Sequence, residues 1–211
     1  METHRISDPE QQERKLKMKL VLCDKNITLC NEWQKYFKNE QNVKIVCADF
    51  RAVPEFDCIV SPANSFGIMD GGFDLALINY FGLELMKLVQ AKIKNEYAGE
   101  QPVGTCLIVE TGNKKHPYLA HTPTMRVPRI IREYDTVYNA MRAMLLAVKK
   151  HKDIKTVLCT GLGTATGNVP FNIAAKQMYL AYKNIVNPPK EIDWQMAVNT
   201  EQKILNSLGG V

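Results

Sequence analysis

Residues 156–187, TVLCTGLGTATGNVPFNIAAKQMYLAYKNIVN, decide the fold that the sequence predicts. Their first five residues form a short apolar run, which predicts a buried strand. Residues 161–170 contain three glycines and predict a loop, and residues 171–187 predict a helix that ends before Pro188 and Pro189. A strand that enters a helix through such a loop is typical of proteins in which strands and helices alternate.

The same alternation extends through the rest of the chain. Runs rich in apolar and β-branched residues predict further strands at residues 19–23, 43–48, 58–60, 105–110 and 118–122. Apolar residues spaced three and four apart predict further helices at residues 28–39, 73–95, 133–150 and 192–208. In helix 73–95 we expect the core-facing side chains to be Leu77, Phe81, Leu85, Leu88 and Val89. This order predicts a three-layer α/β/α fold with a central mixed, mostly parallel sheet.

The composition is that of one ordinary globular domain. Of the 211 residues, 45% are hydrophobic and 23% are charged, which is enough apolar material for one substantial core. We expect residues 1–17 to be a polar leader and residues 18–211 to form a single domain. The formal net charge of +5 is spread along the chain, so it fits an anionic ligand without requiring nucleic acid.

The cysteine pattern and the hydropathy favour an intracellular protein. None of the six cysteines belongs to a CxxC pair, and most lie in or beside apolar runs, which predicts reduced, buried thiols and no metal site. These residues are Cys23, Cys30, Cys47, Cys58, Cys106 and Cys159. No run approaches the roughly 20 apolar residues that a membrane span requires. We therefore expect a cytosolic protein, or a nuclear one if the host has a nucleus, with no membrane partner.

The loop at 161–170 has the chemistry of an anion site. It follows a strand and opens a helix, so its amides and the positive end of the helix dipole can point at one phosphate. A Walker A loop would carry lysine where Asn168 stands, and a Rossmann fingerprint would be GxGxxG early in the fold. A tight turn without a ligand stays open on this pattern alone.

A second loop, residues 61–74 (SPANSFGIMDGGFD), adds polar chemistry at another strand end. It combines a polar cluster, the pair Gly71-Gly72 and a carboxylate, Asp74, at the start of a helix, which core packing alone does not select. Ligands of parallel α/β sheets bind at the carboxyl ends of the strands. Both loops are expected at that edge, and together they predict one site.

These segments resemble the macro domain family, which binds ADP-ribose. Residues 61–64 are similar to the family's "NAAN" strand end, 71–77 to its loop 1 with the following helix, and 163–170 to its loop 2. Residues 47–50 resemble its "GD-I/V" pair, and 120–122 its "IHA" strand. The resemblance spans residues 19–186. Residues 104–111 and 123–128 (PTMRVP) are further similar to a branch of bacterial and viral macro domain proteins.

The resemblance implies a role for each matched residue. Asp49 would accept a hydrogen bond from the adenine amino group, and Asn64 would hold the distal ribose. The amides of residues 163–167 would hold the diphosphate. Asp74 would activate a water against the anomeric carbon, and Asp70 could share that work. The other residues implied at the ligand are Phe50, Ala63, Ser65, Gly71, Gly72, Phe73, Gly161, Gly163, Thr164, Ala165, Thr166, Gly167 and Asn168. No cofactor and no metal is implied.

The sequence departs from the family pattern and leaves structural roles open. Loop 1 has Met69-Asp70 where hydrolytic relatives carry more glycines, loop 2 lacks their aromatic residue, and Ser61 replaces the first Asn. Asp49 and Asp74 could instead cap helices, a role worth about 0.5–2 kcal/mol. Asn64 could satisfy turn amides, and His121 is expected to be a hydrogen-bonded core histidine.

Three classes of function follow from this pattern. The first is an ADP-ribosyl hydrolase that releases ADP-ribose from modified protein or nucleic acid, or cleaves an acyl or phosphate ester of ADP-ribose. The second is a reader or sponge of ADP-ribose or a related NAD-derived nucleotide. The third, a structural protein with a decayed cleft, is disfavoured because Asp49, Asn64 and both loops occur together. The position and charge of Asp74 favour the enzyme, and Arg126 or Arg129 could reach a phosphate.

Overall fold

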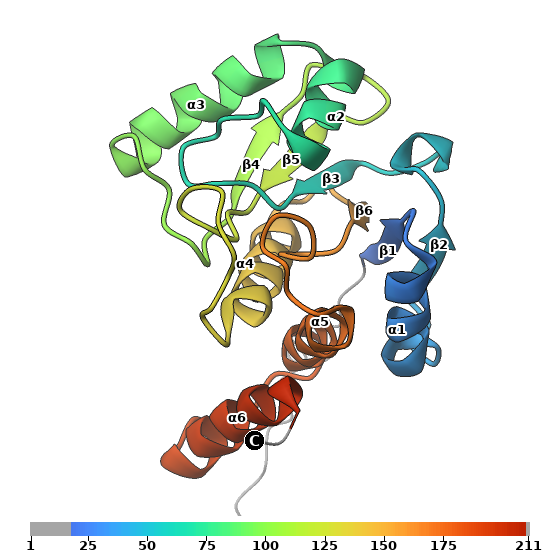
Figure 1. The fold of residues 1–211 in the computed structure, drawn as a ribbon, viewed down its shortest axis with the longest axis vertical. Helices are drawn as coiled ribbons and strands as arrows, with labels where there is room; N and C mark the ends of the chain where they lie inside the picture. Colours follow the sequence, from blue (N-terminus) through green and yellow to red (C-terminus); the bar gives the residue numbers. More distant parts are fainter. Residues whose placement is uncertain (1–17, 210–211) are drawn as a thin grey trace, which may run out of the picture.

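The computed structural model describes residues 18–209 as a six-stranded sheet with helices on both faces (Figure 1). The strands are β1 (Lys19–Asp24), β2 (Val43–Cys47), β3 (Cys58–Ser61), β4 (Leu107–Glu110), β5 (Tyr118–His121) and β6 (Thr156–Cys159). The helices are α1 (Ile27–Phe37), α2 (Gly72–Phe81), α3 (Glu84–Tyr97), α4 (Thr136–Lys150), α5 (Phe171–Val186) and α6 (Trp194–Leu205), with short 3₁₀ turns η2 (Phe50–Ala52) and η3 (Asn206–Leu208). The predicted leader, residues 1–17, lies outside the described residues.

The sheet is mixed and mostly parallel, as the sequence predicts. The strand order is β2-β1-β6-β3-β5-β4, and every neighbouring pair is parallel except β4 with β5. The carboxyl ends of β1, β2, β3 and β6 therefore meet at one edge of the sheet. Both glycine-containing loops leave from that edge, since one follows β3 and the other follows β6.

Alternating side chains along the strands build two cores. In β1, Leu20 and Leu22 pack on the face covered by α1, α4 and α5, whereas Val21 and Cys23 pack on the face covered by α2 and α3 (Figure 1). All four side chains are buried, which matches the two-residue period of a strand. Burial on both faces holds the strands in register and fixes their ends, where the candidate site lies.

The prediction of one continuous helix over residues 73–95 is wrong, because the chain forms two helices there, α2 and α3. Gly82 adopts φ 98°, a conformation that favours glycine, and its N–H donates to the Ile78 carbonyl at the end of α2. The break resets the helical phase. Leu85 and Val89 are buried as expected, but Leu88 is 44% exposed and does not face the core.

Smaller differences concern the last helix and one thiol. Helix α6 begins at Trp194, where the Asp193 carboxylate accepts from the Met196 amide, and it lies beyond α5, away from the sheet (Figure 1). All six cysteines are free, and Cys47 is exposed although its apolar strand predicts burial. Within residues 18–209, no helix is long and apolar enough to cross a membrane.

Candidate functional site

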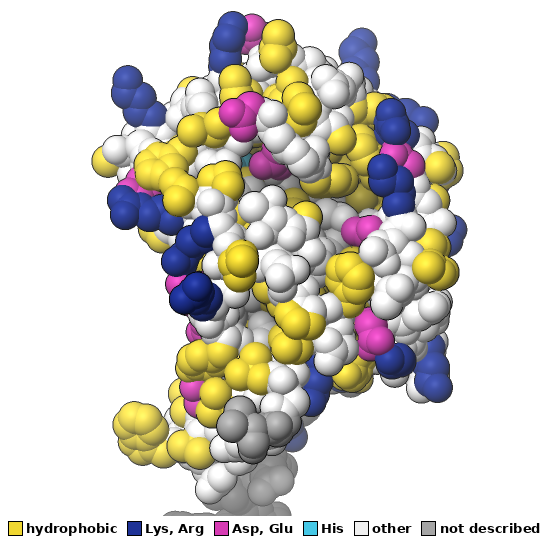
Figure 2. Space-filling view, viewed as in Figure 1, with side chains coloured by type: hydrophobic (Ala, Val, Ile, Leu, Met, Phe, Trp, Pro, Cys, Tyr) yellow, Lys and Arg dark blue, Asp and Glu magenta, His cyan; other side chains and the backbone are white. Residues whose placement is uncertain are grey.

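Two adjoining cavities open at the carboxyl edge of the sheet. The first, of about 360 Å³, lies between the loop after β3 and the loop after β6. The second, of about 220 Å³, lies beside the ends of β1 and β2. The linings of both include Asp24, Gly72, Phe73 and Thr160, so the two cavities form one elongated cleft. In Figure 2 the centre of this face is mostly uncharged, and Lys and Arg side chains lie toward its edges.

The loop between β6 and α5 is closely folded on its own backbone. Gly163 has φ 70°, and its carbonyl accepts from the Val169 amide at 3.0 Å. A Cβ atom on Gly167 would stand 2.5 Å from that same carbonyl oxygen. The glycines therefore let two turns of the loop touch, which a side chain would prevent. Residues 163–167 consequently stay close together along one wall of the first cavity.

Gly167→Ala is expected to lower the free energy of unfolding by roughly 1–3 kcal/mol, because its Cβ would overlap backbone that cannot move aside. Gly71→Ala is the matched control, because a Cβ there meets nothing within 4 Å and the backbone φ of −149° suits any residue. Urea denaturation of both variants measures the difference. Equal stability of the two variants would contradict this account of loop 2.

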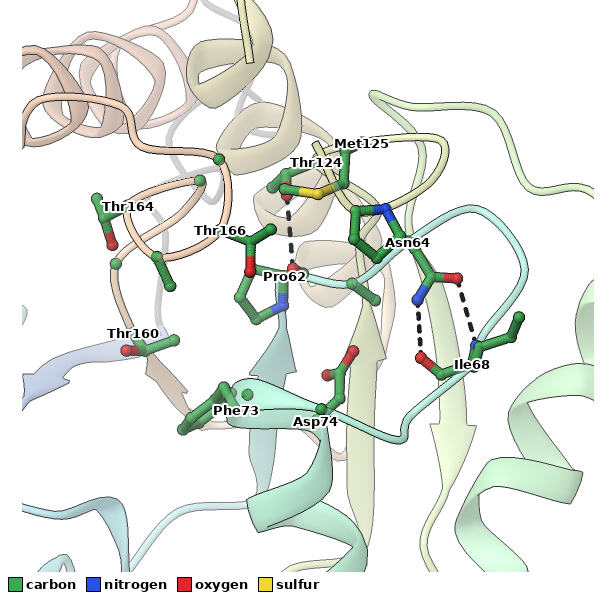
Figure 3. A pocket seen from close by; sticks show the side chains of 18 of the residues that line it. Pro62, Asn64, Ile68, Phe73, Asp74, Thr124, Met125, Thr160, Thr164 and Thr166 are labelled. Carbon is green, nitrogen blue, oxygen red and sulfur yellow. Dashed lines mark hydrogen bonds between the residues drawn. The ribbon is translucent and has the colours of Figure 1, made fainter. Parts of the chain in front are cut away.

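Asp74 lies in the first turn of α2, and its carboxylate points into the first cavity (Figure 3). The residue is only 9% exposed, and the Ser61 hydroxyl donates to its Oδ1 atom at 2.6 Å. Burial raises the pKa of the Asp74 carboxyl to about 6, and the Ser61 hydrogen bond partly opposes this shift. A carboxylate with a raised pKa is a better proton acceptor near neutral pH than an ordinary one.

Asn64 lies across the first cavity from loop 2 and holds its own loop together (Figure 3). Its amide nitrogen donates to the Ile68 carbonyl at 2.7 Å, and its Oδ1 atom accepts from the amides of Phe66 and Ile68 at 3.1 and 3.3 Å. The turn role that the sequence leaves open is therefore present. Because Asn64 also lines the cavity, contact with a ligand remains a separate prediction.

Asp49 lines the second cavity and is already paired with a cation. Its carboxylate accepts from the Arg51 guanidinium at 2.7 and 2.9 Å and from the Arg51 amide, so it also caps η2. Hydrogen bonding by the Arg51 side chain, more than any other cause, lowers the pKa of Asp49 to about 2. The carboxylate is therefore ionised at neutral pH and keeps lone pairs that can accept another donor.

An aromatic pair joins loop 1 to the turn after β2 at the second cavity. Phe50 packs edge-on against Phe73, with ring centroids 5.5 Å apart, and both residues line that cavity. This contact connects the end of β2 to the start of α2. Such a pair contributes roughly 0.5–1.5 kcal/mol beyond its buried area. It fixes Phe73, which also lines the first cavity, at the junction.

Most of the residues that the sequence predicts at the site lie together in this cleft. The first cavity is lined by Ala63, Asn64, Asp70, Gly71, Gly72, Phe73, Asp74, Gly161, Gly163, Thr164, Ala165, Thr166 and Gly167. Asp49 and Phe50 line the second. Ser65 and Asn168 line neither: Ser65 donates its amide to the carbonyls of Met125 and Arg126. Arg126 and Arg129 pair with Glu100 and Glu133 and line neither cavity.

Asp24 is a cleft residue that the sequence analysis missed. Its carboxylate accepts from the Thr160 hydroxyl at 2.7 Å and from the Asn26 amide at 2.9 Å, which ties the root of loop 2 to the end of β1. The available signal was an acidic residue directly after the first apolar run. Thr124, Met125 and Pro128 also line the first cavity, and Met125 pairs with Asn64 of loop 1 through an isolated parallel β-bridge.

His121 is a core histidine, as expected. It is fully buried, its Nδ1 atom lies 2.7 Å from the Gln101 Oε1 atom, and burial lowers its pKa to about 3. The Gln101 amide nitrogen donates to the His121 carbonyl, which leaves the Gln101 oxygen as the acceptor. His121 is therefore neutral with its proton on Nδ1. Within residues 18–209, no group of three or more His, Cys, Asp or Glu side chains is placed to hold a metal ion.

Known proteins share both the sequence pattern and the fold of this chain. The family model described as Macro domain matches residues 60–178. An uncharacterised protein of Aquifex aeolicus is 28% identical over 166 residues, which cover 79% of this chain and 94% of that protein. The macrodomain of Mycobacterium tuberculosis DarG has a TM-score of 0.56 at 18% identity and covers 66% of this chain and 89% of its own. An Oceanobacillus iheyensis macrodomain with ADP has a TM-score of 0.55 at 21% identity, over 74% of this chain and 86% of its own.

Proposed function

The chain belongs to the macro domain family, and on this premise we propose that its cleft binds ADP-ribose and hydrolyses the bond between ADP-ribose and a modified protein, a nucleic acid or an ester group. The observation that carries the proposal is Asp74, a buried carboxylate with a raised pKa that points into a cleft walled by a glycine-rich loop. A carboxylate in that place can orient and deprotonate a water.

The shape of the cleft supports one orientation of the ligand. Adenine would occupy the second cavity, where Asp49 can accept from its amino group and Phe50 offers an apolar wall. The diphosphate would lie along residues 163–167, near the start of α5, where the helix dipole favours an anion. The distal ribose would then reach Asn64 and Asp74 at the other end of the first cavity.

In this orientation Asp74 acts on water. The water oxygen forms a bond to the anomeric carbon of the distal ribose while the bond from that carbon to the modified group breaks. The water proton passes to the Asp74 carboxylate, and the leaving oxygen is protonated by solvent. Because Asp74 works in its ionised form, the rate should rise as the pH passes through about 6 and then level off.

Release of ADP-ribose from a mono-ADP-ribosylated acidic peptide tests the proposal. We expect the wild type to release ADP-ribose over repeated turnovers. Chromatography measures the released nucleotide. Tight binding of ADP-ribose without release would reject the hydrolase and leave a reader. One observation favours that second candidate: loop 1 carries Met69-Asp70 where the hydrolytic members of the family are expected to carry glycines.

Thr166→Asp is expected to weaken ADP-ribose binding at least about tenfold, because a carboxylate on the exposed wall of the first cavity would repel the diphosphate. Asn168→Asp introduces the same charge two residues away, outside both linings, and its backbone φ of 53° is tolerated by Asp. We expect less than about a threefold loss there. Calorimetric titration with ADP-ribose measures the affinity of both variants. Equal losses of affinity would contradict the placement of the diphosphate along residues 163–167.

A further inference from the structure

Ser61 is the last residue of β3 and is completely buried. Its hydroxyl donates to the Oδ1 atom of Asp74 at 2.6 Å, a distance typical of a hydrogen bond to an ionised carboxylate. Ser61 is held from behind by the sheet, because its backbone carbonyl accepts from the Thr122 amide and its neighbour in register on β5 is His121. The hydroxyl therefore has a fixed base from which to reach Asp74.

The surroundings of Asp74 leave Ser61 as its principal polar contact. Burial and the Ser61 hydrogen bond are the two causes that act on the pKa of Asp74, and among residues 18–209 no charged side chain adds to them. The other titratable groups near this end of the cleft are Asp70 and Asp24, which line the same cavity, and the neutral His121 on β5. A change at Ser61 should therefore act directly on the Asp74 carboxylate.

A carboxylate has two oxygens, and rotation about its terminal bond exchanges them. The Ser61 hydroxyl, at the end of β3, holds Oδ1 through its hydrogen bond, which leaves the other oxygen of a carboxylate that points into the cavity (Figure 3) for a second donor. We propose that Ser61 is a positioning residue, whose hydroxyl fixes the orientation of the Asp74 carboxylate and keeps one oxygen aimed at the water that attacks the ribose. This inference rests on the proposed hydrolase function.

Ser61→Ala tests the proposal through Asp74 itself. Loss of the donor should raise the pKa of the Asp74 carboxyl by at least about one pH unit, measured by NMR titration of its carboxyl carbon. The acidic limb of the kcat profile should move to higher pH by the same amount. With ADP-ribosylated peptide as substrate, kcat should fall about tenfold or more, while KM changes less than about twofold. Ser61→Thr retains the hydroxyl and should restore both the pKa and kcat.

Two further variants separate positioning from folding. Ser207 is also a buried serine, and its hydroxyl donates to the Ile204 carbonyl far from the cleft. Ser207→Ala should lower stability without moving the pKa of Asp74. If Ser61→Ala does not fold, Ser61→Cys keeps the shape with a weaker donor and should raise the same pKa.

An unchanged pKa of Asp74 in folded Ser61→Ala or Ser61→Cys would overturn the inference. A wild type that titrates as expected but releases no ADP-ribose would instead overturn the proposed hydrolase and, with it, the role of Ser61 in turnover. The NMR titration and the release assay therefore report the two failures separately. A raised pKa in the alanine variant together with an unchanged kcat profile would also reject the positioning role.

Discussion

Asp74→Asn is expected to lower the rate of ADP-ribose release by about 10²–10⁴-fold, the usual contribution of a general base. Asparagine keeps the shape of the side chain, and its oxygen can still accept the Ser61 hydroxyl that now bonds to Asp74 Oδ1. It cannot accept a proton from water. Binding of ADP-ribose should change by less than about threefold, since the substitution leaves both cavities open. Single-turnover release and calorimetry measure the two effects.

Asp70→Asn distinguishes between the two carboxylates of loop 1. Asp70 lines the same cavity but is exposed, so its carboxylate is hydrated and less able to activate a water in the cleft. We expect a loss of less than about tenfold in release. A loss as large as that of Asp74→Asn would show that the two residues share the work. Full activity of Asp74→Asn would remove Asp74 from the mechanism.

Most of the fold was predictable, because the hydrophobic pattern that indicates each strand or helix lies within a short run of neighbouring residues. The apolar run of β6, the glycines of loop 2 and the amphipathic α5 all follow from neighbouring residues. The break at Gly82 was not predictable in the same way, because one glycine inside an apolar repeat is compatible with a continuous helix. In the fold, Gly82 adopts a positive φ, and Leu85 and Val89 of α3 are buried after it.

The sequence predicts which residues line the cleft, but not the hydrogen bonds that they make there. Strand ends of a parallel sheet bring both loops to one edge, so Asn64 and Asp74 could be expected to lie near residues 163–167. The hydrogen bond between Asp24 and Thr160 could not be expected, because it joins residues 136 positions apart. The depth of Asp74 and its bond to Ser61 likewise depend on how α2 docks against β3, which no local pattern specifies.

Asp74→Asn is also expected to be more stable than the wild type at neutral pH. The pKa of Asp74 is about 6 in the folded chain, whereas an unfolded Asp titrates near 3.9. Between these values the unfolded chain loses its proton and the folded chain retains it. The contribution of Asp74 to the free energy of unfolding should therefore fall as the pH rises from about 4 to about 6 and level off above. The buried His121, with a pKa of about 3, contributes in the opposite direction over this range, so the effect is read from the difference between the wild type and Asp74→Asn. The cost at neutral pH is at most about 3 kcal/mol, at 1.36 kcal/mol per pH unit.

Asparagine carries no charge at any pH, so this cost disappears in the variant. Urea denaturation should show a gain of about 1–3 kcal/mol for Asp74→Asn at neutral pH, and a gain that vanishes below about pH 4. Asp49→Asn provides a control of opposite sign, because Arg51 lowers the pKa of that carboxyl and its charge stabilises the fold at neutral pH. A stability difference between the wild type and Asp74→Asn that does not change with pH between about 4 and 6 would mean that Asp74 titrates normally. The proposal that Asp74 acts as a general base would then fail, because desolvation both lowers the stability of the fold and raises the basicity of the carboxylate.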